Sequence, residues 1–257
     1  MASENFHFES FIFSEEIENA FNFDFPDYIV LGKQAEACFE FCLKNSKRYK
    51  LLAANIQVQG DTETLGELDY IVFDTETEKT IHIELAGKFY LYDDSLAGNM
   101  EAKWIGPNRK DTLEFKLNKL QKKQFPLLYA PETIAKLTTL GIKNIMEMEQ
   151  QLCLKASLFL PKDFQKEKLS QNYQDCIEGH YIFAEQFASE DKNAMFAIPN
   201  KKEWLLPFAE IKNWYSFSEA EELIKKQLSE KTSPLVYKRT QTGIEKFFVV
   251  WWHFDSA

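Results

Sequence analysis

Three strand-like segments lie close together between residues 51 and 91, and they restrict the fold more than any other feature of the sequence. The segments are Leu51–Gln59, Leu68–Asp74 and Thr80–Leu91. The first ends with Ile56 and Val58 alternating with glutamines, and alternation with a period of two is typical of a strand. Residues 60–66 and 74–79 are short polar connections, which join antiparallel neighbours and not parallel ones. The sequence therefore predicts an antiparallel meander.

The residues around the meander predict helices and further strands. Ala35, Cys38, Phe39, Cys42 and Leu43 follow the spacing of an amphipathic helix over Leu31–Asn45. A second helix is expected to start at a capping Asp111, run to Phe125 and end at Pro126, before a strand over Leu154–Leu160. The remaining expectations are a helical stretch Pro131–Met148 broken near Gly141, a strand Tyr181–Phe187, a helix with Ala220, Leu223, Ile224 and Leu228 on one side, and a strand Phe247–Trp252.

The size and composition indicate one α/β domain. The chain has 257 residues, of which 45% are hydrophobic and 27% charged, so it is long enough to bury a core without disulfides. No internal repeat or linker divides it. Within a single domain 1–257 we expect an acidic, phenylalanine-rich arm over 1–30, a core over 31–160 and a C-terminal α/β elaboration over 161–257.

Net charge restricts the partners of the chain. The formal charge of −10 argues against a protein whose whole surface binds nucleic acid, because such affinity comes mainly from Lys and Arg at phosphates. A nucleic acid must instead meet a local basic patch. Lys116, Lys119 and Lys123, in the basic stretch 103–123, are the candidate contacts, and the alternative is a solvated helix face.

The sequence also predicts a cytoplasmic protein without a membrane segment. Its apolar runs are far shorter than the roughly 20 residues of a membrane span. The first residues carry acids where a signal peptide would be basic. The four cysteines lack the spacing of a zinc site, so reduced thiols are expected.

The second and third strands carry the residues with catalytic character. Side chains alternate along a strand, so His82, Glu84 and Lys88 project to one side. Asp69 on the preceding strand is expected close to Glu84. Two neighbouring carboxylates repel unless a cation lies between them, and oxygen ligands suit Mg²⁺ or Mn²⁺. We therefore expect a metal at Asp69 and Glu84 with Lys88 as a third catalytic residue. The alternative is a Glu84–Lys88 ion pair beside a solvated Asp69.

Four further side chains are candidates for this site. Glu36 on the first helix is a candidate metal ligand, and Glu67 shares a strand face with Asp69. His82 is a candidate phosphate ligand or general base, and Gln124 is expected one helical turn beyond Leu120, facing the same cleft. The structural alternatives are an exposed helix residue for Glu36 and a hydrogen-bonded strand histidine for His82.

The order of elements resembles a known superfamily. A helix, a three-stranded meander, a helix and a strand, with Asp69 on the second strand and Glu84 on the third, resembles the PD-(D/E)XK nuclease-like core. Gly66-Glu67-Leu68-Asp69 and His82-Ile83-Glu84 look like the corresponding strands of its resolvase-like members. Those members have lysine two residues after the acid, where this chain has Ala86. Lys88 lies two residues further along the same face, about 7 Å away at roughly 3.3 Å per residue.

A longer resemblance links the chain to one uncharacterised bacterial family, domain of unknown function 1853. It is carried by four motifs, Ala54-Asn55-Ile56-Gln57-Val58, Thr64-Leu65-Gly66-Glu67-Leu68-Asp69, His82 to Leu91, and Trp104-Ile105-Gly106-Pro107-Asn108, together with a late Trp204-Leu205-Leu206-Pro207. It runs from about Leu31 to the C-terminus. The resemblance implies an α/β fold with a restriction-endonuclease-like core, a mixed central sheet and C-terminal elaborations.

These observations lead to two functional hypotheses and to a third possibility, in which the Phe-rich acidic arm and the Trp-rich C-terminus form an oligomer or partner interface and the acidic site is vestigial. The first is a nuclease that uses a divalent metal to hydrolyse phosphodiester bonds of DNA or RNA. The second is a catalytically inactive nuclease-like protein that binds nucleic acid or a protein partner. The sequence leaves open the choice between DNA and RNA, the mode of cleavage and the oligomeric state.

Overall fold

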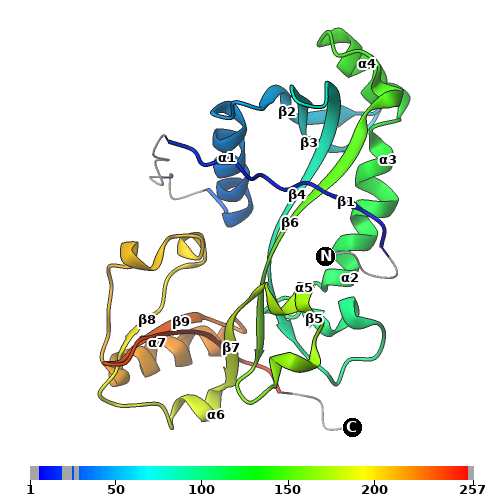
Figure 1. Ribbon diagram of the computed structural model, residues 1–257. Helices are drawn as coiled ribbons and strands as arrows, with labels where there is room; N and C mark the ends of the chain where they lie inside the picture. Colours follow the sequence, from blue (N-terminus) through cyan, green and yellow to red (C-terminus); the bar gives the residue numbers. More distant parts are fainter. Residues whose placement is uncertain (1–5, 19–24, 26–28, 254–257) are drawn as a thin grey trace. The chain divides into compact units, whose positions relative to one another are not determined.

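A computed structural model describes residues 6–18, 25 and 29–253 (Figure 1). The α-helices are α1 (Leu31–Lys44), α2 (Leu113–Lys119), α3 (Phe125–Leu127), α4 (Pro131–Thr139), α5 (Gln171–Gln174), α6 (Ala184–Phe187) and α7 (Phe217–Ser229). The strands are β1 (Glu9–Ser10), β2 (Tyr49–Gln59), β3 (Thr64–Asp74), β4 (Lys79–Tyr92), β5 (Trp104–Ile105), β6 (Glu149–Pro161), β7 (Ile177–Phe183), β8 (Met195–Ala197), β9 (Leu235–Arg239) and β10 (Ile244–Val250). Two further segments, a π-helical η2 (Leu120–Gln124) and a 3₁₀-helical η5 (Lys201–Glu203), contribute to the sites described below.

Within the described ranges, the strands form one mixed sheet of ten. Its order is β2-β3-β4-β6-β7-β10-β9-β8, with β1 beside β6 and β5 beside β4. β2, β3 and β4 form the predicted antiparallel meander. β6, β7 and β10 are parallel neighbours, and β9 is antiparallel to β10. The predicted strand Leu154–Leu160 lies within β6, so it joins the same sheet as β3, as expected.

The chain divides into two compact units, and each is described by itself below. The first unit comprises residues 1–24, 32–87 and 116–155, and the second comprises 25–31, 88–115 and 156–257. β4 and β6 each contribute residues to both units.

No helix in the described part of the chain is long and apolar enough to cross a lipid bilayer.

In the first unit, helices cover both faces of the meander (Figure 1). On one face, Phe39 and Leu43 of α1 pack against Tyr70 and Ile83. On the other face, the α3 and α4 region contributes Leu127, Leu128 and Leu137, which pack with Leu68 and Ile71 of β3. The apolar side of α1 that its sequence periodicity predicts is therefore the side that packs on the sheet.

Residues 6–18 of the acidic N-terminal arm belong to the first unit. β1 pairs with β6 in parallel, with Glu9 opposite Gln151. The ring of Phe11 is buried, with its centroid 5.8 Å from that of Phe39 and 5.1 Å from that of Tyr49. Phenylalanines that look like an exposed arm in sequence are therefore partly core residues. The rest of the predicted arm, residues 1–5, 19–24 and 26–28, lies outside the described residues.

The helix expected over residues 111–125 differs from the prediction at both ends. Its cap is the hydroxyl of Thr112, which accepts a 3.0 Å hydrogen bond from the Phe115 N–H, whereas Asp111 pairs with Lys88. Pro126 does not end the helical path, because the wider π-turn of η2 precedes it and α3 continues to Leu127. A proline near the start of a new helical segment lacks only an N–H that would be unpaired anyway.

Two strands of the second unit have different boundaries from those that the sequence predicts. The strand expected over Tyr181–Phe187 is β7, which ends at Phe183, and α6 follows it. The Gln186 side-chain oxygen accepts a 2.8 Å hydrogen bond from the Phe183 N–H and so starts that helix. The last strand is β10, which runs from Ile244 to Val250 instead of from Phe247 to Trp252. The predicted amphipathic helix is α7, which buries Ala220 and Ile224.

The second unit also buries both faces of its strands. α7 and α6 pack on one face, where Ile224 and Phe187 meet Phe247 and Val249. On the other face, Trp204 packs between Phe89 and Phe248, with both ring centroids 5.1 Å away. The Gly106-Pro107-Asn108 turn is tied to this unit, since Pro107 O accepts hydrogen bonds from Ser233 Oγ and Trp252 Nε1 at 2.7 and 3.1 Å.

Candidate acidic site in the first unit

Asp69 and Glu84 face each other across two neighbouring antiparallel strands. The β3–β4 pairing runs to Tyr70 opposite Ile83, and Asp69 and Glu84 are the next residues in line. The ladder stops there, and Oδ2 of Asp69 accepts a 2.8 Å hydrogen bond from the backbone N–H of Leu85. The Asp69 side chain therefore replaces a backbone partner at the point where the strands part. This is the relative placement that the sequence predicts.

The carboxylate of Glu84 is fully buried and held by two donors. The side chain is 0% exposed, and Oε1 lies 3.1 Å from Nε2 of His82. Oε2 accepts a 2.5 Å hydrogen bond from Nε2 of Gln124 in η2. A buried carboxylate is costly without such donors, and two of them fix its orientation.

His82 is held in a single orientation by its neighbours. The side-chain amide of Gln150 donates to Phe125 O at 2.8 Å and lies 3.1 Å from Nδ1 of His82. An amide N–H can only donate, so Nδ1 is the acceptor and the proton belongs on Nε2, which donates to Glu84. The role of His82 here is to orient Glu84.

The pKa of Asp69 is raised to about 7. Burial is the main cause and the negative charge of Glu84 the second, with a smaller contribution from Glu36. The hydrogen bond from Leu85 and the positive charge of Lys116 act in the opposite direction but do not compensate. Asp69 and Glu84 therefore form an acid pair whose repulsion the surrounding side chains leave partly unbalanced.

The lysine that acts on this pair is Lys116. Its Nζ donates a 3.1 Å hydrogen bond to Oε1 of Gln124, the same amide whose nitrogen holds Glu84. Lys88, the lysine singled out from the strand pattern, is placed in the second unit, where its Nζ lies 2.8 Å from Oδ2 of Asp111. The sequence suggested Lys116 only as a nucleic-acid contact, because its distance from β4 along the chain hides their proximity.

Glu36 and Glu67 both form ion pairs with a different lysine, Lys33. Lys33 lies 2.5 Å from Glu36 and 3.5 Å from Glu67. The side-chain amide of Asn55, oriented by these neighbours, donates to both carboxylates at 3.1 Å. Glu36 affects Asp69 only electrostatically, since its negative charge is one of the causes that raise the pKa of Asp69. Glu67 belongs to the Lys33 cluster.

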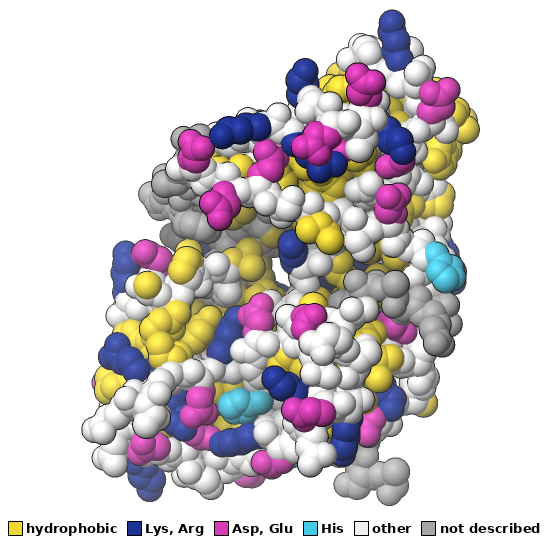
Figure 2. Space-filling model, viewed as in Figure 1, with side chains coloured by type: hydrophobic (Ala, Val, Ile, Leu, Met, Phe, Trp, Pro, Cys, Tyr) yellow, Lys and Arg dark blue, Asp and Glu magenta, His cyan; other side chains and the backbone are white. Residues whose placement is uncertain are grey.

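Lys119 and Lys123 lie on the exposed side of the α2–η2 region. They do not join the Gln124 network, in contrast to Lys116. Figure 2 shows basic and acidic side chains interspersed over the visible face, without a continuous basic band.

The donor set limits which metal could bind. Among residues 6–18, 25 and 29–253, no group of three or more His, Cys, Asp or Glu side chains is placed to hold a metal ion. Asp69 and Glu84 are two carboxylates, and Oδ1 of Asp69 accepts no hydrogen bond from a described residue. Mg²⁺ commonly binds through one or two carboxylates and keeps several waters, so the two acids have the oxygen chemistry of a Mg²⁺ or Mn²⁺ site and not of a zinc site, but both oxygens of Glu84 already accept hydrogen bonds.

Comparison with known proteins identifies the family. Residues 20–250 match the family described as "Domain of unknown function (DUF1853)". The chain belongs to the DUF1853 family. Both Asp69 and Glu84 fall inside the matched range, as do Gln124 and Lys116. No curated protein and no solved structure matches this DUF1853 chain.

Proposed function

We propose that the chain is a metal-dependent nuclease that hydrolyses phosphodiester bonds at Asp69 and Glu84. The observation that carries this proposal is the placement of Asp69 and Glu84 opposite each other on neighbouring strands, and the pKa of Asp69, which burial and the charge of Glu84 raise, agrees with it. A divalent cation would balance that charge, and Oδ1 of Asp69 has no hydrogen bond from the described residues that the cation would have to displace. The resemblance to PD-(D/E)XK nucleases supports the same reading of the two strands.

The chain's own residues would organise the reaction around this pair. Asp69 and Glu84 would hold Mg²⁺ or Mn²⁺, which when bound polarises the phosphate and lowers the pKa of an attacking water. His82 and Gln124 keep Glu84 in one orientation. Gln124 also positions Lys116, whose ammonium group would stabilise negative charge on the phosphate in the transition state.

A second candidate function is binding of nucleic acid without catalysis. Two observations favour it: both oxygens of Glu84 already accept hydrogen bonds, and Lys88 is paired with Asp111. In that case Asp69, with its raised pKa, would be partly protonated near neutral pH, and exposed Lys119 and Lys123 would contact phosphates. Nucleic acid would then bind equally well with and without metal.

The decisive experiment combines calorimetry with cleavage assays. Mg²⁺ and Mn²⁺ are titrated into the full chain, and single- and double-stranded DNA and RNA are incubated with each metal or with EDTA. We expect metal binding and cleavage that both disappear in Asp69→Ala, with the protein still folded by circular dichroism. If neither metal binds and no substrate is cleaved, the nuclease proposal fails.

Variants of three lysines identify the one that assists catalysis. Lys116→Met is expected to keep metal binding while losing about 100-fold in cleavage rate, since one oriented charge typically contributes that much. Lys119→Met, one helical turn closer to η2, is the matched control and should retain the rate. Lys88→Met tests the lysine suggested by the strand pattern, and a rate loss confined to that variant would remove Lys116 from the proposal.

A further inference from the structure

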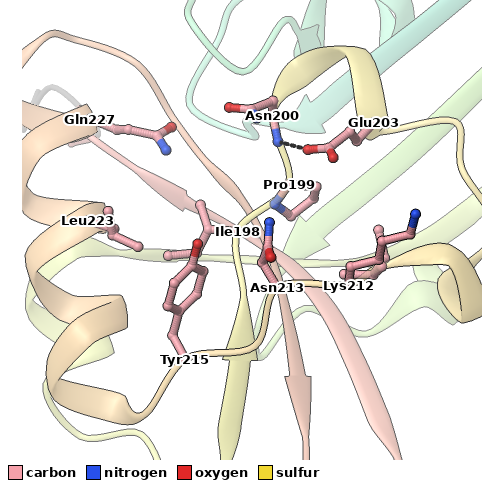
Figure 3. Close-up of a pocket in the computed structure, with 10 residues that line it drawn as sticks. Ile198, Pro199, Asn200, Glu203, Lys212, Asn213, Tyr215, Leu223 and Gln227 are labelled. Carbon is pink, nitrogen blue, oxygen red and sulfur yellow. Dashed lines mark hydrogen bonds between the residues drawn. The ribbon is translucent and has the colours of Figure 1, made fainter. Parts of the chain in front are cut away.

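The second unit contains two adjoining hollows between α7 and the segment around η5. The larger has a volume of about 390 Å³ and the smaller about 150 Å³. Both are lined by Pro199, Asn200, Leu223 and Gln227, so they share one wall. Figure 3 shows the smaller hollow, with Leu223 and Gln227 projecting from α7 toward residues of the opposite segment. The larger hollow falls in the roughly 300–1,000 Å³ range typical of small-molecule sites.

The smaller hollow is lined by both apolar and polar residues. Ile198, Pro199, Ile211 and Leu223 supply the apolar surface. The polar groups are the side-chain amides of Asn200, Asn213 and Gln227, the hydroxyl of Tyr215, and one acid and one base, Glu203 and Lys212, whose charges balance. Among the described residues, no hydrogen bond engages the amide of Asn213 or of Gln227. An amide offers two donors and an acceptor in one plane, the set that reads the edge of a nucleobase.

The larger hollow carries the positive charge. Lys201 and Lys226 line it together with one acid, Glu230. Within the described part of the chain, neither lysine forms an ion pair. The Nζ of Lys201 lies 5.7 Å from the ring centroid of Trp204, which is buried and donates its indole N–H to Pro199 O at 3.3 Å. The net charge of these lining residues therefore favours an anion.

Two sequence motifs that the acidic site does not use meet at this hollow. Asn108 comes from the Trp104–Asn108 motif and Trp204 from the Trp204–Pro207 motif. Oδ1 of Asn108 accepts a 2.9 Å hydrogen bond from the N–H of Ser233, which leaves its amide nitrogen available to a ligand. The motifs thus build one wall of the larger hollow.

We propose that these adjoining hollows bind a nucleoside 5′-monophosphate. The base occupies the smaller hollow, where apolar walls contact its faces and the amides of Asn213 and Gln227 bond to its edge. The phosphate lies in the larger hollow beside Lys201 and Lys226, whose ammonium groups form charge-assisted hydrogen bonds with it. The site is separate from Asp69 and Glu84, and its occupancy does not depend on the proposed nuclease activity.

Calorimetry in EDTA with the full chain tests the proposal. The probes are the four ribonucleoside monophosphates, inorganic phosphate, ribose 5-phosphate and adenosine. We expect at least one mononucleotide to bind saturably and at least about tenfold tighter than the three fragments, because only the mononucleotide uses both hollows. Absence of saturable mononucleotide binding, or equal affinity for inorganic phosphate, would overturn the assignment.

Substitutions then locate the bound molecule. Lys201→Gln and Lys226→Gln should each weaken mononucleotide binding about tenfold, and Gln227→Leu should weaken it without changing the affinity for inorganic phosphate. Lys225→Gln is the matched control, since this neighbour of Lys226 pairs with Glu221 at 3.0 Å and does not line the hollow. Asp69→Ala should leave mononucleotide binding unchanged. Equal affinity in the wild type and the three test variants would place the nucleotide elsewhere and refute the proposal.

Discussion

Gln124 donates a 2.5 Å hydrogen bond to Glu84, forty residues earlier in the chain. The bond joins η2 to β4, and the same amide accepts a hydrogen bond from Lys116. In η2 the N–H of Phe125 bonds to Leu120 O, five residues back, which is the wider turn of a π-helix. Such turns are frequent at functional sites, and this one presents Gln124 to the acid pair.

Replacing Gln124 tests whether it organises the acidic site. Gln124→Ala removes one donor from Glu84 and the acceptor that positions Lys116, so metal affinity or cleavage should fall about 10- to 100-fold. The measurement is calorimetry with Mn²⁺ together with the cleavage rate. Gln121→Ala, on the exposed side of the same segment, is the control. Equal losses in both variants would indicate a general disturbance of η2.

The raised pKa of Asp69 predicts how stability depends on pH in the metal-free protein. An acid whose pKa is higher in the folded state favours folding below its ordinary pKa near 4, and this contribution is lost as pH rises through about 7. Asp69→Asn removes that titration while its side-chain oxygen can still accept from Leu85. The variant should therefore gain stability relative to wild type between pH 5 and pH 8.

Urea unfolding at pH 5, 6, 7 and 8 in EDTA measures this difference. Asp61→Asn, in the exposed turn between β2 and β3, serves as the control and should track the wild type at every pH. A constant difference between Asp69→Asn and wild type across this range would show that Asp69 does not titrate there.

The Arg48–Asp74 pair predicts the opposite dependence at low pH. Arg48 Nε and Nη2 donate to the two carboxylate oxygens of Asp74 at 2.8 and 2.6 Å, which holds the pKa of this buried acid below its usual range. The stabilisation is therefore present above pH 4 and is lost as pH falls further. Asp74→Asn should cost about 2 kcal/mol at pH 7 and progressively less below pH 4.

Glu76 provides a matched comparison for Asp74. Its carboxylate lies 2.9 Å from Nη1 of the same arginine, but its side chain is 65% exposed. Glu76→Gln should therefore change the free energy of unfolding by less than about 1 kcal/mol. Chemical denaturation at pH 7 and pH 3 distinguishes the two variants. Similar losses at pH 7 would mean that burial of Asp74 does not strengthen its pair.

Gly179 is required where β7 and β10 approach closely. A Cβ at this position would lie 2.0 Å from the backbone oxygen of Lys246, so the strands would have to separate. Gly179→Ala should lower the free energy of unfolding by about 3 kcal/mol. Gly32, near the start of α1, has no atom within 4 Å of such a Cβ, and Gly32→Ala should be neutral or stabilise by up to about 1 kcal/mol. Denaturant melts of both variants give the comparison.

Local patterns were sufficient for the meander and for α1. Alternation and a 3.6-residue period report which side chains face a core, and the connections of β2, β3 and β4 are too short for a parallel arrangement. The neighbouring positions of Asp69 and Glu84 follow from the same geometry. The periodicity did not indicate where the apolar run that starts at Tyr181 changes from strand to helix. β7 ends at Phe183 because the side chain of Gln186 caps the helix that follows.

The sequence by itself determined the meander, the facing acids and the family. The tertiary structure decided which side chains surround those acids. Gln124 bonds to Glu84 and to Lys116, and Gln150 bonds to His82, because η2 and β6 pack beside β4, a relationship between segments far apart in the chain. The same packing buries Glu84 and raises the pKa of Asp69, since desolvation depends on all the atoms that exclude water and not on neighbours in sequence.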